Sequence, residues 1–498
     1  MPFRRTYSRT SLHKQNIIYT HWYSKKHTEK RNLNMTEGPI FGKMLAFILP
    51  LMLTNLLQVF YGVADTVIVG FSGVPDAVGA VGVTASLTGL IVNVFIGFAT
   101  GTNVMVSRYL GEKNDEKVSN VVHTSVALSV LFGVLCLFIG VFTSRPLLVL
   151  MGVDGHLLEL ATTYTTIYFL GVPFISLTNY LIAIYRAKGD TRTPLIILTL
   201  TGLLNVILNF VFVFAFDTSV EGVALATMIS NIFSTIFLTL HLGKDKGPCK
   251  IVLRKLSIDK DELKNIIYVG LPAGIQSSFF SISNMTIQSA IIQVNNMVTP
   301  VGSLFEPVVK GHTATNSLDN FIYTSQNTVY QAAITFTSQN FGAKKYDRIP
   351  KIMKNAYLLG PLAALIVSAI IIVFRNPLLA LYGITSGPVG SVEAIAYNTA
   401  ITHLMMISAP YFMFPLMEVG CGVIRGLGKS ISSTVISLCG VCIFRILWVA
   451  TAFHIKPTLE VLYISYPLSW VLTATVFFIY ILKVLKPLLR QNDQINIL

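Results

Sequence analysis

Long apolar segments recur along almost the whole chain and constrain its fold more than any other feature. Each is about 20 residues or longer, the length that an α-helix needs to cross the roughly 30 Å hydrocarbon layer of a bilayer. With 53% hydrophobic and only 12% charged residues, the chain is predicted to be an all-α membrane protein. The short alternating segments of a membrane β-barrel are not found in the sequence. We expect twelve transmembrane helices, at residues 44–70, 78–107, 121–142, 157–181, 194–216, 220–241, 264–292, 311–340, 353–374, 393–420, 431–453 and 459–482.

The basic residues are distributed unevenly between the two sides of the predicted helices. The formal net charge is +14. Of the Lys and Arg residues around the expected spans, 23 belong to the loops after even-numbered helices and four to the loops after odd-numbered ones. This asymmetry follows the positive-inside rule and predicts that both termini and the basic loops are cytoplasmic. The charge is therefore expected to reflect topology and contact with anionic membrane lipid, not binding to nucleic acid.

The two halves of the chain share short motifs in the same order. Pro50 and Pro272 open the first and seventh spans, and Ser107 and Ser338 begin the similar segments SRYLGEK and SQNFGAK. Two further pairs, GVPF with SAPY and YRAKGD with IRGLGK, continue the series at offsets that grow from 222 to 239 residues. Because six helices separate equivalent elements, the sequence predicts two six-helix repeats related by a pseudo-two-fold axis along the membrane normal. The substrate path should lie between them.

This repeat divides the chain into lobes and connecting segments. The first 34 residues are basic and lack the apolar core of a signal peptide, so we expect a disordered cytoplasmic extension there. Met35 opens MTEGPIFGKMLAF, which reads as a natural beginning of the protein. The expected division is an extension at 1–38, an N-lobe with helices 1–6 at 39–242, a cytoplasmic linker at 243–262, a C-lobe with helices 7–12 at 263–484 and a cytoplasmic tail at 485–498.

Asp65 is the only residue that is charged at neutral pH in the apolar segment MLAFILPLMLTNLLQVFYGVADTVIVGF. A charged side chain at membrane depth costs roughly 2.5–3.5 kcal/mol on insertion scales and is rarely retained without a role. Asn55, Gln58 and Gly62 precede Asp65 at helical spacing, so one polar stripe faces a protein interior or a water-filled cavity. The stripe predicts either a carboxylate that binds a proton or a cation, or a structural polar contact between packed helices.

Several segments together resemble one known family. They are GPIFGKMLAFILPLMLTNLLQVFYGVADTVIVG, GFATGTNVMVSRYLGEKN, YRAKGDTRTPL, LNVILNFVFVF, EGVALATMISN, QAAITFTSQNFGAKKYDRI, MEVGCGVIRGLGKS and FRILWV. Over residues 38–486 the chain resembles the multidrug and toxic compound extrusion (MATE) transporters, in their prokaryotic branch. The resemblance implies two six-helix lobes around a V-shaped central cavity. It also implies export of cationic or amphipathic drugs by antiport against protons or sodium ions, through alternating access in the cell membrane.

The same resemblance implies roles for individual residues. Asp65 matches the acid of the first helix, where the family binds its coupling ion. Asn205 and Thr227 match polar positions of the fifth and sixth helices, and Asn209 stands where many prokaryotic members have an aspartate. Two neighbouring carboxylates raise each other's proton affinity, so the missing second acid leaves the stoichiometry and the choice between H⁺ and Na⁺ open.

The second half offers further candidates. At the position that matches Asp65 it carries Ile287, so coupling is expected to reside in the N-lobe. Glu418 and Arg445 are charges of opposite sign in the tenth and eleventh spans, where they either form a structural ion pair or act in gating or substrate binding. Flexible methionines beside aromatic rings suit either a promiscuous binding surface or simple packing against lipid or the protein core, and the candidates are Met413, Met417 and Tyr411. The prolines Pro173, Pro410 and Pro415 are expected bending points.

Two other functions remain open. A lipid-linked oligosaccharide flippase of the same superfamily would need several cationic residues in its cavity, and a membrane scaffold that transports nothing would leave Asp65 without a role. Motifs typical of enzymes are not found: GVIRGLGKS departs from the Walker A spacing, and the CxxC at Cys439 and Cys442 lies in an apolar segment. We therefore expect no enzymatic activity, no cofactor and no metal other than a coupling Na⁺, and a monomer whose partners are drug-like molecules and lipid.

Overall fold

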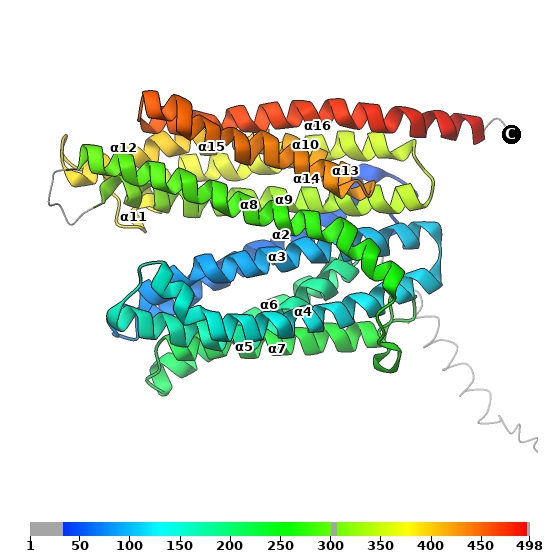
Figure 1. Ribbon diagram of the computed structural model, residues 1–498, viewed down its shortest axis with the longest axis horizontal. Coiled ribbons are helices and arrows are strands. Elements are labelled where there is room, and N and C mark those ends of the chain that lie inside the picture. The colour runs from blue at the N-terminus through cyan, green and yellow to red at the C-terminus, as the bar shows by residue number, and fades with distance from the viewer. Residues whose placement is uncertain (1–32, 300–305, 496–498) are drawn as a thin grey trace, which may run out of the picture.

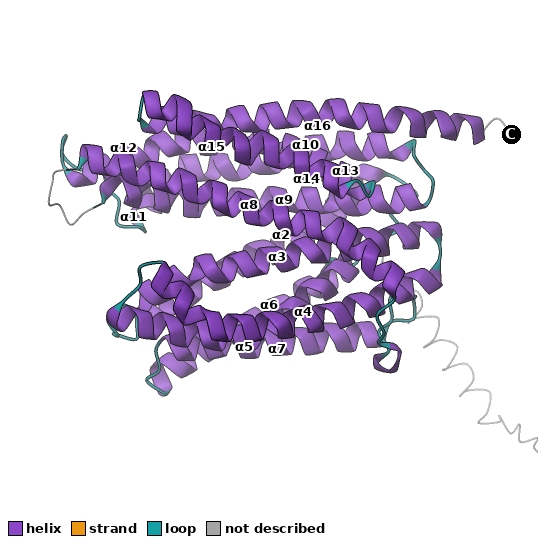
Figure 2. Ribbon diagram, in the orientation of Figure 1, coloured by secondary structure: helices purple, strands orange, loops and turns teal. Residues whose placement is uncertain are grey.

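The computed structural model describes residues 33–299 and 306–495, and within these ranges every regular element is helical (Figure 2). The predicted extension at 1–32 and the last residues of the tail lie outside the described residues. The N-terminal half contains α2 (Ile40–Gly70), α3 (Ala77–Glu112), α4 (Asp115–Leu150), α5 (Gly155–Ala187), α6 (Arg192–Phe210) with a π-helical turn at Val211–Ala215, and α7 (Val220–Gly243). The C-terminal half contains α8 (Lys260–Val298), α9 (Pro307–Gly342), α10 (Arg348–Val373), α11 (Arg375–Ala380), α12 (Val392–His403), α13 (Phe414–Gly426), α14 (Ser430–Ser437), α15 (Phe444–Trp448) and α16 (Leu459–Ile495).

The twelve expected spans correspond to helices of this structure, and the predicted fold class is confirmed. Within the described residues, eleven helices are long and apolar enough to cross a membrane, when α12 with α13 and α14 with α15 are each taken as one span. The eighth predicted span is α9, which is long enough but more polar. Most of its side chains are buried, so α9 lies inside the bundle, where protein groups form hydrogen bonds with many of its polar side chains. Its Thr335, for example, bonds to Asn103 of α3.

The tenth and eleventh spans are irregular. Between α12 and α13 the chain makes a π-helical turn at Leu404–Ser408 and a 3₁₀ turn at Ala409–Met413, so the predicted irregularity at Pro410 and Pro415 is found. The helix α5 is continuous through Pro173, so the bending point expected there stays a prediction. In the eleventh span, π-helical turns at Leu438–Ile443 and Val449–Phe453 stand on either side of α15.

The helices form two lobes that lie side by side (Figure 1). The N-lobe contains α2–α7 and the C-lobe α8–α16, with α8 beginning next to α4 and crossing toward the second lobe (Figure 1). The lobes meet where α3 packs against α8 and α9. Glycines allow this close approach: a Cβ atom on Gly97 of α3 would lie 2.4 Å from the Cα atom of Gly274 in α8. Small residues at such a crossing are typical of packed membrane helices.

At the end of the bundle that carries the basic loops, which we call the basic end, the two lobes are bonded together. Gln339 Nε2 of α9 donates to the carbonyl oxygen of Ala187 at 2.6 Å, and Arg108 Nη2 of α3 donates to that of Leu427 at 3.1 Å. A Cβ atom on Gly111 would lie 2.1 Å from the carbonyl oxygen of Gln339. The structure is therefore closed at the basic end.

Residues 33–38 take part in this closure. Met35 is fully buried, and its carbonyl oxygen accepts a hydrogen bond from Asn340 of the C-lobe at 3.1 Å. On the other side, the amide of Leu33 donates to the carbonyl oxygen of Gly189 in the N-lobe at 3.4 Å. The expectation of an extension through residue 38 is therefore wrong for residues 33–38, which belong to the folded protein.

Of the other two boundaries, that of the linker is close to the one expected and that of the C-terminal tail is not. The predicted linker at 243–262 lies between the end of α7 at Gly243 and the start of α8 at Lys260. It is fixed by Asp245, whose carboxylate pairs with Lys188 at 2.6 Å; burial alone would raise the pKa of Asp245, but the ammonium of Lys188 holds it below its usual value. The helix α16 continues to Ile495, so the expected boundary between C-lobe and tail at 484 is wrong.

Candidate functional site

Asp65 and the three polar residues expected around it meet inside the N-lobe. Asp65 lies on α2, and its Oδ1 accepts a hydrogen bond from Asn209 Nδ2 of α6 at 2.5 Å. Its Oδ2 accepts one from Thr227 Oγ1 of α7 at 3.2 Å. Asn205, one turn before Asn209, donates from its Nδ2 to Thr227 Oγ1 at 3.3 Å, and its own Oδ1 accepts from Asn209 Nδ2 at 3.4 Å. Three helices thus converge on one half-buried carboxylate.

The chemistry of this group is set by neutral neighbours. Among the described residues, no Lys, Arg or His forms an ion pair with Asp65. Asn209 is fully buried, and its Oδ1 has no hydrogen-bond partner among the described residues. A buried amide oxygen without a donor is rare, since it loses its bond to water and gains none. Next to a carboxylate, it offers a second oxygen to a sodium ion, or an acceptor for the hydrogen of a protonated Asp65.

The polar stripe of α2 reaches a cavity of about 310 Å³ between the lobes. Asn55 and Gln58 both line it, as the sequence predicts. Polar side chains from both lobes, including Arg186 of α5 and Gln331 of α9, complete its wall. Asp65 is not part of that wall, so the stripe contributes two side chains to the cavity and one to the Asp65 site.

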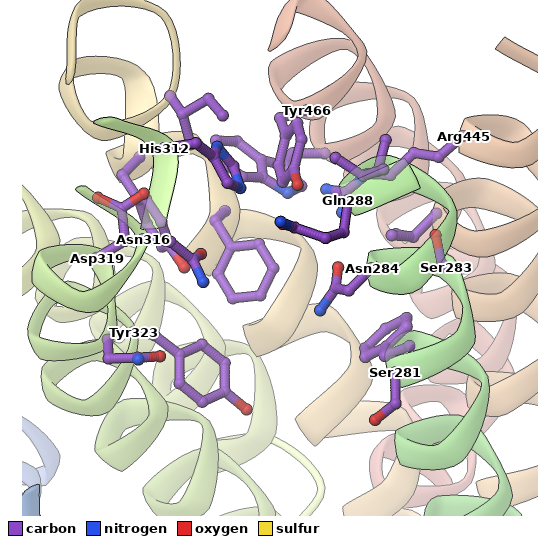
Figure 3. A pocket seen from close by; sticks show the side chains of 18 of the residues that line it. Ser281, Ser283, Asn284, Gln288, His312, Asn316, Asp319, Tyr323, Arg445 and Tyr466 are labelled. Carbon is purple, nitrogen blue, oxygen red and sulfur yellow. The ribbon is translucent and has the colours of Figure 1, made fainter. Parts of the chain in front are cut away.

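A second cavity, of about 370 Å³, lies mainly in the C-lobe (Figure 3). It contains an acid that the sequence analysis missed, Asp319 of α9. Asp319 is buried, with Oδ2 2.9 Å from His403 Nε2 and Oδ1 accepting from Ser408 Oγ at 2.5 Å. Behind it, the Nδ1 atoms of His403 and His312 are 3.0 Å apart, and His312 Nδ1 is 3.2 Å from the hydroxyl of Tyr463. The C-lobe therefore holds a carboxylate within a chain of imidazole rings.

A signal for Asp319 was present in the sequence. It is the only acid in the predicted span 311–340, which is the same property that singled out Asp65 in the first span. The expectation that the seventh helix has no acid at the matching position is correct, and Ile287 instead lines the C-lobe cavity. Comparing the two repeats position by position overlooked Asp319, because it reaches the C-lobe cavity from α9 and not from the matching position in α8.

Of the two alternatives left open for the buried charges Glu418 and Arg445, the described part of the structure does not have the ion pair. Both are buried, but no ion pair joins them within the described residues. Arg445 Nε donates to Ser469 Oγ at 3.2 Å, and its guanidinium carbon lies 3.9 Å from the ring centroid of Tyr466. The cation that acts electrostatically on Glu418 is Arg425, on the same helix.

Arg425 itself needs a correction, because the charge pattern assigned it to a cytoplasmic loop. It is 3% exposed within α13. Its Nη1 donates to the hydroxyl of Tyr330, and its Nη2 donates to Gln276 Oε1 at 2.7 Å and to Thr434 Oγ1 at 3.4 Å. The described part of the C-lobe therefore holds two buried arginines, Arg425 and Arg445.

The expected methionine surface is part of the core. Met417 is fully buried in the C-lobe core, and Met413 packs against that core. Neither lines the two cavities described above. Core packing, the alternative that the sequence left open, is therefore what the structure has for both methionines. Tyr411 does line the C-lobe cavity, where its ring centroid is 5.1 Å from that of Trp470.

Comparison with known proteins identifies the family of this architecture. The family model described as MatE matches residues 50–211 and 279–450, which covers most of both lobes. The chain is 26% identical to the probable multidrug resistance protein YoeA of Bacillus subtilis over 411 residues, which are 81% of this chain and 85% of that protein. It is 24% identical to the multidrug export protein MepA of Staphylococcus aureus over 260 residues, 52% of this chain and 58% of MepA.

Solved structures share the fold. One is the outward-facing conformation of a multidrug resistance MATE family transporter of the MOP superfamily, with a TM-score of 0.82, 22% identity and coverage of 92% of this chain and 99% of that chain. Another is a MOP superfamily transporter from Pyrococcus furiosus described as having a binding pocket of reverse polarity, with a TM-score of 0.83, 22% identity and coverage of 92% and 98%. At this identity the similarity shows the two-lobed arrangement and nothing finer.

Proposed function

We propose that this chain, which belongs to the MatE family of membrane transporters and not to a family of enzymes, exports cationic or amphipathic small molecules by antiport against protons or sodium ions. The multidrug names of the relatives YoeA and MepA support this class of cargo. The cavity of about 310 Å³ between the lobes, lined by Asn55 and Gln58, offers room for part of such a molecule.

The observation that carries the proposal is the arrangement around Asp65. An acid held only by neutral donors can exchange its ligand, because it is not neutralised by a fixed cation. When Asp65 is ionised, Asn209 Nδ2 and Thr227 Oγ1 donate to it. When a proton binds, the new hydroxyl can donate to Asn209 Oδ1, which has no partner in the present arrangement. A sodium ion would use the same oxygen as a ligand.

Coupling then follows from the helices that carry these groups. Asp65, Asn209 and Thr227 come from α2, α6 and α7, so a change in their hydrogen bonds changes how three helices of the N-lobe pack. The same α2 presents Asn55 and Gln58 to the cavity between the lobes. Binding of the ion and release of cargo can therefore bias one conformational equilibrium, which is the requirement for antiport.

The present structure would be one end state of this cycle. The basic end is closed by bonds between the lobes, including Gln339 to Ala187 and Arg108 to Leu427. With the basic end in the cytoplasm, as the positive-inside rule expects, this state is closed to the cytoplasm. We place the protein in the cell membrane with both termini in the cytoplasm, acting as a single chain in contact with lipid.

The flippase alternative is less favoured. A pyrophosphate headgroup needs several cations close together. Arg186 and Arg445 line two different cavities, and each of these cavities has no second Lys or Arg among its described lining residues.

Transport by the purified, reconstituted protein tests the proposal. Proteoliposomes loaded with a fluorescent cationic dye are given a proton gradient, a sodium gradient or neither, with the membrane potential clamped. We expect efflux that is accelerated by one of the two gradients. Efflux that is equal under all three conditions would reject antiport, and the gradient that accelerates it identifies the coupling ion.

A further inference from the structure

Arg445 is a buried cation without a counter-ion in the described part of the chain. It is 6% exposed, and no described carboxylate pairs with it. Its Nε is held by Ser469 Oγ, and its planar group stacks on the ring of Tyr466. These contacts fix the direction of the guanidinium and leave both terminal nitrogens without a protein acceptor among the described residues. A buried charge with free donors is costly unless a ligand pairs with it.

The backbone around Arg445 is also unusual. The five residues of α15 lie between π-helical turns at Leu438–Ile443 and Val449–Phe453. Such turns widen the helix and occur frequently at functional sites. Here they surround the one turn that presents an arginine to the C-lobe cavity (Figure 3).

The cavity that Arg445 faces contains further free donors. Asn284 and Gln288 of α8 and Asn316 and Asn320 of α9 line it, and their amides make no hydrogen bond within the described residues. In Figure 3, Gln288 and Asn284 lie on the α8 side of the cavity and Asn316 on the opposite side, with Arg445 and Tyr466 at one end. Each amide can donate two hydrogen atoms to an oxygen-rich group.

Asp319, the acid in the same wall, does not neutralise Arg445. Both of its oxygens are already engaged, one by Ser408 Oγ at 2.5 Å and one by His403 Nε2 at 2.9 Å. No contact between Asp319 and Arg445 is found. The cavity therefore combines a satisfied anion with an unsatisfied cation, and an incoming group of negative charge is the one that it can pair with.

The lining of the C-lobe cavity also includes a group of aromatic rings. Tyr411, Phe414 and Trp470 form one cluster, with ring centroids 5.1–5.5 Å apart, beside Tyr466. Tyr323 belongs to this cavity and also to the cavity between the lobes that Asn55 and Gln58 line. A molecule could thus place an acidic group at Arg445 and its apolar or cationic part toward the centre of the protein.

We propose that the C-lobe cavity is a cargo subsite in which Arg445 binds the acidic group, a carboxylate or sulfonate, of an amphipathic aromatic molecule. This deepens the proposed function and rests on it, because it says which part of an exported molecule enters which lobe. The class of cargo that it predicts is zwitterionic or acidic, in addition to simple cations.

The test is a matched pair of dyes that differ only in the acidic group. Rhodamine 6G is a cationic ester, and its hydrolysed free acid carries a carboxylate on the same chromophore. Binding to the full-length protein in a neutral detergent is measured by fluorescence anisotropy for wild type, Arg445→Gln and Arg445→Lys. Arg145→Gln is the matched control, since this arginine pairs with Glu159 on the exposed surface.

We expect the wild type to bind the free acid about tenfold more tightly than the ester. Only the free acid can form a charge-assisted hydrogen bond with Arg445, and in a buried site such a bond strengthens binding by about this factor. Arg445→Gln should remove this preference while it still binds the ester, which shows that the variant is folded. Arg445→Lys should restore part of the preference, and Arg145→Gln should keep all of it. A wild type without the preference, or Arg445→Gln with it, would overturn the proposal.

An acidic group could also come from a lipid. The titration is therefore repeated with phosphatidylglycerol and with phosphatidylcholine in the micelles. Loss of the free-acid preference only with phosphatidylglycerol would mean that a lipid phosphate occupies the subsite, and the assignment to cargo would be wrong. The assay needs no ion gradient, so intact antiport without the preference rejects the subsite alone. If neither dye is transported by wild-type proteoliposomes, the proposed function fails instead.

Discussion

Each lobe holds a carboxylate on a membrane-spanning helix, and the two are held in opposite ways. Asp65 is half-buried, receives hydrogen bonds from an amide and a hydroxyl, and has a free amide oxygen beside it. Asp319 is buried, and both of its oxygens are occupied by groups of its own lobe, an imidazole and a hydroxyl. The difference indicates that an acid inside a membrane protein is not by itself a coupling site: what its neighbours leave free decides whether it can exchange a ligand.

The polar neighbours of the two acids also have different effects. The hydrogen-bonding neighbours of Asp65 come from two helices of its own lobe, α6 and α7, and are all neutral, so no described residue supplies a partner of opposite charge and a proton or sodium ion could take that place. Around Asp319, the imidazole of His403 already contacts one carboxylate oxygen, and His403 in turn contacts His312. We therefore expect Asp65 to control transport and Asp319 to control stability.

The largest expected effect is on transport, from Asp65→Asn. The amide fits where a protonated acid fits, but it cannot release a proton or bind sodium with a full charge. Gradient-driven efflux should fall by about 100-fold or more. A loss of rate of this size is expected when a residue that is essential to one step of the cycle is removed. The measurement is efflux per inserted molecule. Asp76→Asn, at an exposed aspartate, is the control and should transport normally.

A second effect is on stability, from Asp319→Asn. The new amide turns one acceptor into a donor, so either His403 or Ser408 loses its partner in a buried place. Leaving such a group unpaired costs about 1–3 kcal/mol. We expect a lower midpoint of thermal unfolding in detergent for Asp319→Asn and an unchanged one for Asp65→Asn. An Asp319→Asn protein that is as stable as wild type but unable to transport would contradict the different roles assigned to the two acids.

A smaller change is expected from Asn209→Asp, which gives the N-lobe a second carboxylate next to the first. Because two acids at 2.5 Å cannot both ionise easily, they should share a proton and titrate in two steps. The pH dependence of efflux should therefore shift while transport persists. A pH profile identical to that of wild type would mean that residue 209 does not act on Asp65 during transport.

The smallest effect is expected from deletion of residues 2–32, which leaves both acids and the segment from Leu33 in place. The topological signal is supplied by the downstream basic loops, so insertion should be unchanged. A matched deletion of residues 2–38 removes Met35 and its bond to Asn340 and should reduce transport. Equal activity of the two shortened forms would show that the segment 33–38 is dispensable.

Much of the fold could be predicted from sequence, because its signals are local. Length and hydropathy placed all twelve expected spans, including α9 as the eighth. Among the described helices, α9 is less apolar than the other eleven, since a helix enclosed by other helices does not need an apolar surface. The end of α16 was missed for a different reason: its last turns continue beyond the apolar segment.

For the candidate sites, some residues were predicted correctly from the sequence and others were missed. Asp65, Asn205, Asn209 and Thr227 do meet, as the motifs predicted. The sequence could not decide whether Glu418 pairs with Arg445, because opposite charges on neighbouring spans carry no information about side-chain direction. Ser469 and Tyr466, which hold Arg445, have no distinctive sequence signal. Asp319 was missed although it has the same signature as Asp65.

The most direct test of the central claim is whether cargo moves the coupling ion through Asp65. Proteoliposomes containing an internal pH or sodium indicator receive a cargo gradient and no imposed ion gradient. The account predicts that cargo drives a countermovement of protons or sodium ions in the wild type and in Asp76→Asn, and none in Asp65→Asn. Ion movement of wild-type size in Asp65→Asn would contradict it.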